Sequence, residues 1–206
     1  MHALSELQQD ALLEIFNIGV GQAAAALSDI VNEKVTMAVP SLSFLDRSGV
    51  AALLGVGDDV RTCGISQHFR GAFETSAVLM FPEHKSLELV RLMLGDSTPL
   101  AELSAMEQEA LSEIGNILLN ACIGALADIF EHELRGSMPR YHAGGSEEVL
   151  AAACAGAADT HVLMLHIDFA LERHQVDGYV AFILGMGALD KLRAHIDHYL
   201  QRMGVG

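Results

Sequence analysis

Apolar residues recur every three or four positions in two long segments of this sequence, which is the spacing of one helix face. The first segment predicts a helix over residues 5–32, and Ser5 with Gln8 has the spacing of a capping box at its start. The second segment predicts a helix over residues 104–132, where Ser104 and Glu107 repeat the same capping pattern. Both helices should turn an apolar stripe toward the core.

Shorter segments rich in apolar and β-branched residues follow the first helix and predict strands. They are residues 34–44, 60–69 and 73–81. Pro82 ends the third strand and opens a helix over residues 83–94. Residues 46–59 are rich in glycine, and a short helix and a loop both fit them.

The second half of the chain repeats this order. A strand is predicted over residues 133–142, followed by a loop through Gly144 and Gly145. Residues 147–158 are rich in alanine and fit either a helix or a strand. Residues 160–171 and 178–184 predict a long hairpin, and a final helix follows residues 185–187 and extends to about residue 203.

An internal duplication explains the repetition. With an offset of 99 residues, residues 1–40 and 100–139 are identical at 14 positions. We therefore expect a single domain, residues 1–206, made of repeats 1–99 and 100–206 and linked through residues 95–99. The predicted fold class is α+β: each half contributes a helix, three strands and a helix, and together they form an antiparallel sheet of about six strands flanked by helices.

A polar motif lies beside the apolar stripe of the first helix. Asp10, Glu14 and Asn17 fall within one narrow arc, because a helix turns by about 100° per residue. Pro40 follows Asn17 after 22 intervening residues. Asparagine is a mediocre helix former, because its side chain competes for nearby backbone groups. An ordinary solvated face remains one interpretation of this arc.

The second helix carries the same motif. Glu109, Glu113, Asn116 and Asn120 fall within one arc, and Pro139 follows Asn116 at the same distance. A duplication copies residues whether or not they are used. Glu, Asn and Pro nevertheless stayed together while most other positions diverged, which favours a carboxylate-and-amide stripe that meets a partner.

Charge and composition exclude several functions. Lys and Arg number 12 against 27 Asp and Glu, a net charge of −15, which argues against binding nucleic acid or an anionic membrane. No apolar run reaches the roughly 18 residues of a membrane helix, and no signal peptide is present at the start. We therefore expect a cytoplasmic protein. Three cysteines without C-x-x-C spacing predict buried thiols rather than disulfides.

Other common active-site patterns are missing from the sequence. The ten histidines show no helical zinc spacing; His195 and His198 share a face of the last helix, but no third ligand accompanies them. We therefore predict no metal site. The glycine-rich segments lack the phosphate-loop and dinucleotide patterns, and no serine lies in a nucleophile elbow.

The pattern Asp/Ser-x3-Glu-x2-Asn-x22-Pro, present twice in a chain of this length, resembles the CheC-type family of chemotaxis phosphatases, which includes CheX and FliY. The first copy matches at Asp10, Glu14, Asn17 and Pro40. The second copy carries Glu109 where the family has Asp or Ser, which keeps the carboxylate and lengthens it by a methylene. The resemblance spans both halves and implies the fold expected above.

The resemblance also implies a function, the dephosphorylation of a phospho-aspartyl CheY-like response regulator in chemotaxis signalling. Asn17 and Asn116 would be catalytic residues that align a water with phosphorus. Glu14 and Glu113 would bind a lysine of the regulator. The regulator would bring its own Mg²⁺, so no cofactor of the protein's own is expected.

Asp10 and Glu109, one turn before the glutamates, would extend the contact with the partner. A second function stays open, a non-catalytic module that binds the phosphorylated regulator or a CheD-type receptor deamidase. The two complete Glu/Asn pairs favour catalysis, because an amide that orients water is a recognised device in phosphoryl transfer and an adaptor does not need it.

Overall fold

Helix α1 (Glu6–Val31) begins at the predicted capping box. The computed structural model describes residues 4–46, 49–50, 53, 61–94, 100–153, 160–171 and 174–205. Gln8 N donates to Ser5 Oγ, and Ser5 N donates to Gln8 Oε1. The helix ends at Asn32, whose φ of 55° is left-handed, a conformation that asparagine tolerates. The predicted extent of this helix is confirmed.

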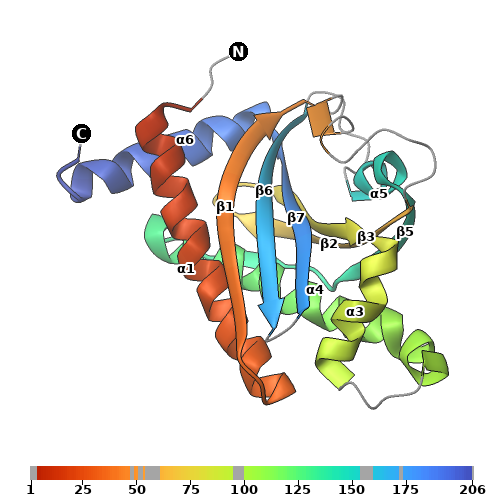
Figure 1. Ribbon diagram of the computed structural model, residues 1–206. Helices are drawn as coiled ribbons and strands as arrows, with labels where there is room; N and C mark the ends of the chain where they lie inside the picture. The colour runs from red at the N-terminus through yellow and green to blue at the C-terminus, as the bar shows by residue number, and fades with distance from the viewer. Residues whose placement is uncertain are drawn as a thin grey trace.

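Seven strands form one antiparallel sheet. Its order is β1–β6–β7–β3–β2, and β4 and β5 both pair with β2. The strands are β1 (Val35–Leu45), β2 (Arg61–Gly71), β3 (Thr75–Pro82), β4 (Leu134–Gly136), β5 (Arg140–Gly145), β6 (Thr160–Leu171) and β7 (His174–Gly185). The α+β class and the flanked antiparallel sheet are confirmed (Figure 1).

The two halves of the chain exchange strands. β1 of the first half pairs with β6 of the second, and β5 of the second half pairs with β2 of the first. The central strands β3 and β7 join the halves, with Val78 opposite Ala181. The strand order is therefore symmetric about this junction. The repeat boundary at residues 99 and 100 stays a prediction, because residues 95–99 lie outside the described part of the chain.

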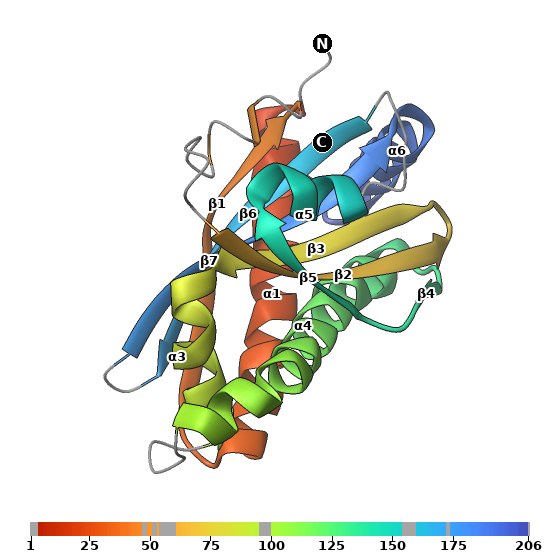
Figure 2. The same ribbon diagram turned by 90° about the vertical axis from the view of Figure 1, so that its right-hand side faces the viewer.

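Helices cover both faces of the sheet. α1 and α4 (Leu100–Phe130) pack on one face, joined by α3 (Glu83–Leu94) and α6 (Met186–Arg202). α5 (Ser146–Ala153) lies on the other face, and Figure 2 shows β2 and β3 between α5 and α4. The main core lies under α1 and α4 and contains the fully buried Phe16, Phe69 and Leu111. A smaller core lies under α5.

The long helices α1 and α4 approach most closely at a glycine. A Cβ on Gly19 would lie 2.7 Å from the backbone oxygen of Ala121 and 3.0 Å from Cys122 Cα. At Gly21 a Cβ would meet nothing within 4 Å. The helix crossing therefore depends on glycine at position 19 and leaves position 21 open.

By length and composition alone, α1 and residues 106–130 of α4 could each cross a membrane. Within these apolar windows, 44% and 56% of the residues are buried in the protein. Both helices supply apolar side chains to the main core, which is the packing of core helices in a globular domain.

Two predictions for the second half are wrong. α4 begins at Leu100, so Ser104 lies inside the helix and does not cap it; Glu107 instead accepts a hydrogen bond from Ser86 Oγ. Residues 133–142 do not form one strand, because β4 and β5 are separated at residues 137–139. Pro139 has no N–H for a strand ladder, and Ser137 N donates to His68 O.

This break accounts for the difference between about six expected strands and seven observed. Gly144 and Gly145, expected in a loop, end β5 opposite Thr62 and Arg61. Of the segments left open, residues 146–153 form α5, while residues 154–158 and most of residues 46–59 lie outside the described part. β7 begins four residues earlier than predicted.

The cysteine prediction is confirmed where the structure describes the chain. Cys63 and Cys122 are buried free thiols. Cys154 lies outside the described residues. Burial raises the pKa of Cys122 to about 12, so this thiol stays protonated at neutral pH.

Candidate functional site

The first motif copy lies on the outer side of α1. Asp10 and Glu14 are exposed, and Asn17 is half-buried where the helix faces β1. Neither carboxylate forms a hydrogen bond or an ion pair with any described residue. The helix therefore presents two unpaired negative charges, with Glu14 one turn before an amide, as the spacing predicted.

The amide of Asn17 is bound to the strand that contains the motif proline. Its Oδ1 accepts from Val39 N at 2.9 Å, and its Nδ2 donates to Val39 O at 3.2 Å and to Leu13 O at 2.9 Å. The pairing of β1 with β6 shifts register between Ala38 and Ser41, so Val39 and Pro40 form a bulge. Asn17 satisfies the peptide groups at this bulge, which gives the Asn–Pro spacing a structural basis.

The second motif copy lies on the outer side of α4. Glu109, Glu113 and Asn120 are exposed, and Asn116 is half-buried. The two glutamates also lack hydrogen-bond and ion-pair partners among the described residues. The two motif copies occupy matching places on neighbouring helices, and among the described residues no hydrogen bond or ion pair joins them directly.

The amide of Asn116 is held by a side chain rather than by a backbone bulge. Its Oδ1 accepts from Gln67 Nε2 at 3.0 Å and from Asn120 Nδ2 at 2.9 Å. Gln67 Nε2 also donates to Ser137 O at 2.9 Å. In the part of the chain that is described, Asn116 Nδ2 has no hydrogen-bond partner, and the only fully buried unpaired polar side-chain atoms are in His161 and Arg193. The nitrogen of Asn116 is therefore unpaired among the described residues and not fully buried.

Sequence reasoning missed Gln67. It lies on β2 midway between Ile65 and Phe69, whose side chains both face the main core. Because side chains alternate along a strand, Gln67 faces the same core. The signal that could have found it is a polar residue at an inward position of a strand, because buried polar groups are hydrogen-bonded. Its partner Ser137 lies in the break between β4 and β5, which the sequence did not predict.

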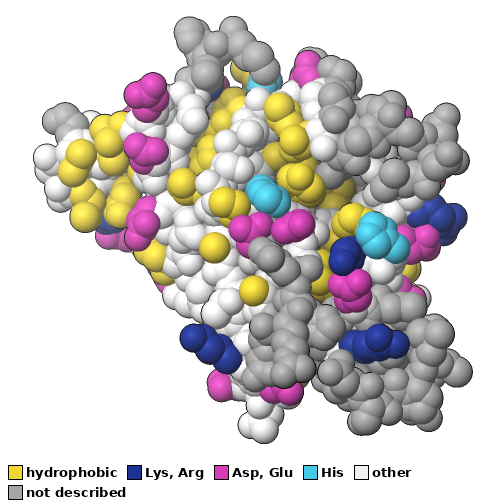
Figure 3. Space-filling model, viewed as in Figure 1, with side chains coloured by type: hydrophobic (Ala, Val, Ile, Leu, Met, Phe, Trp, Pro, Cys, Tyr) yellow, Lys and Arg dark blue, Asp and Glu magenta, His cyan; other side chains and the backbone are white. Residues whose placement is uncertain are grey.

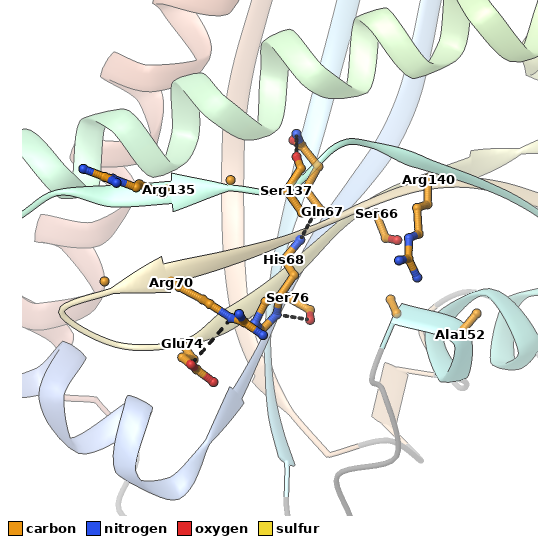
Figure 4. Close-up of a pocket in the computed structure, with 13 residues that line it drawn as sticks. Ser66, Gln67, His68, Arg70, Glu74, Ser76, Arg135, Ser137, Arg140 and Ala152 are labelled. Carbon is orange, nitrogen blue, oxygen red and sulfur yellow. Dashed lines mark hydrogen bonds and ion pairs between the residues drawn. The ribbon is translucent and has the colours of Figure 1, made fainter.

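A hollow about 880 Å³ in volume lies on the face of the sheet that α5 covers, where Ala152 and Ala153 of α5 line it (Figure 4). Gln67 and Ser137 line its edge near α4, and Arg70, Arg135 and Arg140 give it a basic lining. Arg70 lies 3.7 Å from Glu74, and Arg135 pairs with Glu133. The hollow therefore gathers positive charge beside α5, and none of the described residues that line it belongs to a motif copy.

A histidine on β5 contacts Ser66, one of the residues that line the hollow. His142 Nε2 lies 2.8 Å from Ser66 Oγ. Burial, and then the positive charge of Arg140, lowers the pKa of His142 from its ordinary value. The imidazole is therefore neutral at pH 7.

One group of side chains has the composition of a metal site, and it is separate from the motif copies. Candidate ligand atoms of His166, Asp168 and Asp177 lie within 4.8 Å of one another on β6 and β7. They lie on the sheet face turned away from α1 and α4, where Figure 3 shows histidine and acidic side chains gathered over these strands. His195 on α6 stacks on Phe130 instead.

Comparisons with known proteins place this chain among relatives of a single family. Residues 7–44, which contain the first motif copy, match the model of the CheC-like family. The CheY-P phosphatase CheC of Bacillus subtilis is 32% identical over 142 residues, which is 67% of each chain. The flagellar motor switch phosphatase FliY of the same species is 27% identical over 139 residues, 66% of this chain and 36% of that protein.

Solved structures with the same fold include FliY and a chain of a complex that contains CheX and CheY. FliY of Thermotoga maritima has a TM-score of 0.77 at 18% identity and covers 96% of this chain and 100% of its own. A chain of the CheX–CheY–BeF3–Mg²⁺ complex from Borrelia burgdorferi has a TM-score of 0.53 at 14% identity and covers 84% of this chain and 97% of its own. At these identities the likeness shows the fold alone.

The helix-flanked antiparallel sheet is also that of the FliY structure, and the relatives named above are phosphatases. With a relative 32% identical over two thirds of its length, the chain belongs to the CheC-like family. It is a protein phosphatase of that family.

Proposed function

We propose that this protein hydrolyses the aspartyl phosphate of a CheY-like response regulator at two sites, Glu14/Asn17 and Glu113/Asn116. The observation that carries the proposal is an exposed carboxylate without a partner among the described residues, one turn from an amide, on each of two neighbouring helices. The name of the relative CheY-P phosphatase CheC supports the substrate class. The fold match to a chain of a complex that contains CheY supports the partner.

The amides suit a reaction in which the protein positions water and does little covalent work. Asn17 and Asn116 cannot act as bases near neutral pH, but an amide offers two donors and an acceptor to a water. The water oxygen forms a bond to phosphorus, and the bond from phosphorus to the aspartyl oxygen breaks. The electron pair leaves with the regulator's carboxylate, and a water proton passes to the released phosphate. Alignment of the water supplies most of the catalysis.

The glutamates suit the binding of a cation. A carboxylate placed beside a phosphoryl dianion would be repelled, so Glu14 and Glu113 bind a lysine of the regulator rather than the reacting group. Both are exposed and lack partners among the described residues, so no internal ion pair must break when the regulator docks. Asp10 and Glu109 extend this acidic surface by one turn.

The first site has a structural cost that the second lacks. Asn17 must turn away from Val39 to meet a water, because its three hydrogen bonds go to backbone groups. Asn116 already has an open nitrogen. Docking at the first site therefore includes a side-chain rotation.

The regulator carries the Mg²⁺ that the reaction uses, and the protein supplies no cofactor to it. The reaction takes place in the cytoplasm, where such regulators act. A CheD-like deamidase is a further partner for the same acidic surface.

Phosphate release from a phosphorylated CheY-like regulator tests the proposal. Wild-type protein at substoichiometric concentration should accelerate release until all of the regulator is dephosphorylated. A capture module would bind the phosphorylated form and leave release unchanged or slower, and that result would contradict the proposal. Glu14→Gln with Glu113→Gln should weaken binding of the regulator while the fold is kept.

A further inference from the structure

Gln67 is a buried amide that hydrogen-bonds both to Asn116 of the second site and to Ser137 in the break between β4 and β5. Its side chain is 3% exposed and lies between the fully buried Ile65 and Phe69. Burying an amide without hydrogen bonds lowers stability, because the group loses its hydrogen bonds to water. An apolar side chain would fill this core position without that cost, so the polar one calls for an explanation.

The hydrogen-bond chemistry fixes which way the Gln67 amide faces. Ser137 O is a carbonyl and can only accept, so the group 2.9 Å from it must be Nε2 of Gln67. The second hydrogen of that nitrogen then meets the side chain of Asn116 at 3.0 Å. The atom that Asn116 presents there must accept, and it is therefore Oδ1.

Asn120 supports the same orientation independently. Its Nδ2 donates to the backbone oxygen of Asn116 at 2.7 Å, which again can only accept, and to Asn116 Oδ1 at 2.9 Å. Two donors thus hold Oδ1 inward. The N–H groups of Asn116 consequently point away from Gln67 and Asn120, and among the described residues they have no hydrogen-bond partner.

We propose that Gln67 is a positioning residue for the second site, which it serves by fixing the Asn116 amide with its nitrogen outward. This inference rests on the proposed phosphatase function. An outward N–H binds a water through one lone pair of the water and leaves the other lone pair for attack on phosphorus. Because Asn116 is already held in this orientation, its side chain does not have to rotate into place during each turnover.

The first site lacks such a residue. The oxygen of Asn17 accepts from the backbone of Val39, and all its hydrogen bonds go to backbone groups. Removal of the Gln67 amide should therefore affect one site and spare the other. An effect on the second site alone distinguishes a positioning role from a general effect on the fold.

The test uses two single-site backgrounds, Asn17→Ala, which retains the second site, and Asn116→Ala, which retains the first. Gln67→Met, close in size and without hydrogen-bonding groups, is added to each. In the Asn17→Ala background we expect kcat to fall about tenfold or more with little change in KM, because the amide is misplaced after docking. In the Asn116→Ala background we expect both constants to stay unchanged.

A fall of equal size in both backgrounds would show a structural role and overturn the inference, as would unchanged kcat in both. If neither background accelerates phosphate release before Gln67 is changed, the proposed function fails instead. Hydrogen exchange of the Gln67 side-chain amide in the wild-type protein gives a readout that needs no variant. Slow exchange is expected, and exchange as fast as that of an exposed glutamine would contradict the hydrogen bonds.

Discussion

Replacement of Asn17 by alanine should lower stability as well as activity. Val39 is 2% exposed, so water does not readily take the place of the Asn17 amide at its N–H and C=O. An unsatisfied buried backbone group costs about 1–3 kcal/mol. The variant leaves both the N–H and the C=O of Val39 without the Asn17 amide, and the surrounding chain can relax in part. We therefore expect a loss of about 2–3 kcal/mol in the free energy of unfolding.

Asn116→Ala is the matched variant for comparison. It leaves Gln67 Nε2 bonded to Ser137 O and leaves the exposed Asn120 free to bind water. Because Asn116 is half-buried, water can replace its oxygen as the acceptor for Gln67 and Asn120, and we expect a loss of about 1 kcal/mol. The two variants should therefore differ although the motif copies are equivalent in sequence.

Thermal unfolding followed by circular dichroism measures both effects. For a chain of this size, 1 kcal/mol corresponds to about 2–4 °C in Tm, so Asn17→Ala should fall by about 4–12 °C and Asn116→Ala by about 2–4 °C. Equal or negligible shifts would refute the reasoning. They would mean that Asn17 does not anchor the bulge at Val39.

Three further outcomes are expected. Gly19→Val should lower the free energy of unfolding, measured in urea, by about 2 kcal/mol, because the added atoms meet the backbone of α4. Gly21→Val should change it by no more than about 0.5 kcal/mol. Equal losses for the two variants would contradict the close contact between α1 and α4 at Gly19. Glu14→Gln with Glu113→Gln should raise KM for the phosphorylated regulator up to about fivefold. This increase in KM should shrink in high salt, because salt screens exposed ion pairs. An increase of the same size in high salt would argue against an ion pair with the regulator. Cys122, whose pKa burial raises to about 12, should take up iodoacetamide only on unfolding, as peptide mass mapping would show; labelling in the folded protein would contradict its burial.

The sequence predicted those features that depend on local spacing. Ser5 and Gln8 cap α1 as their separation indicates, because a capping box involves only neighbouring residues. Glu14 and Glu113 are exposed as predicted, because the helical period alone places them beside the apolar stripe. The offset between the halves also indicated a symmetric sheet.

Features that depend on contacts between distant segments were missed. The break at Ser137 follows from Pro139 and from a hydrogen bond to His68 on β2, which lies far away in sequence. Glu107 binds Ser86 of α3 rather than capping α4. The role of Gln67 depends on its meeting Asn116 across the sheet–helix interface, which no local pattern specifies.

The most direct measurement compares phosphate release from the phosphorylated regulator by two double variants. Asn17→Ala with Asn116→Ala removes both amides, while Asp29→Ala with Asp128→Ala changes an exposed pair that is also related by the 99-residue offset. Both are assayed below their unfolding transitions. We predict that the asparagine variant returns release to the spontaneous rate and that the aspartate variant matches the wild type. A folded asparagine variant that still accelerates release would contradict the assignment of catalysis to these amides.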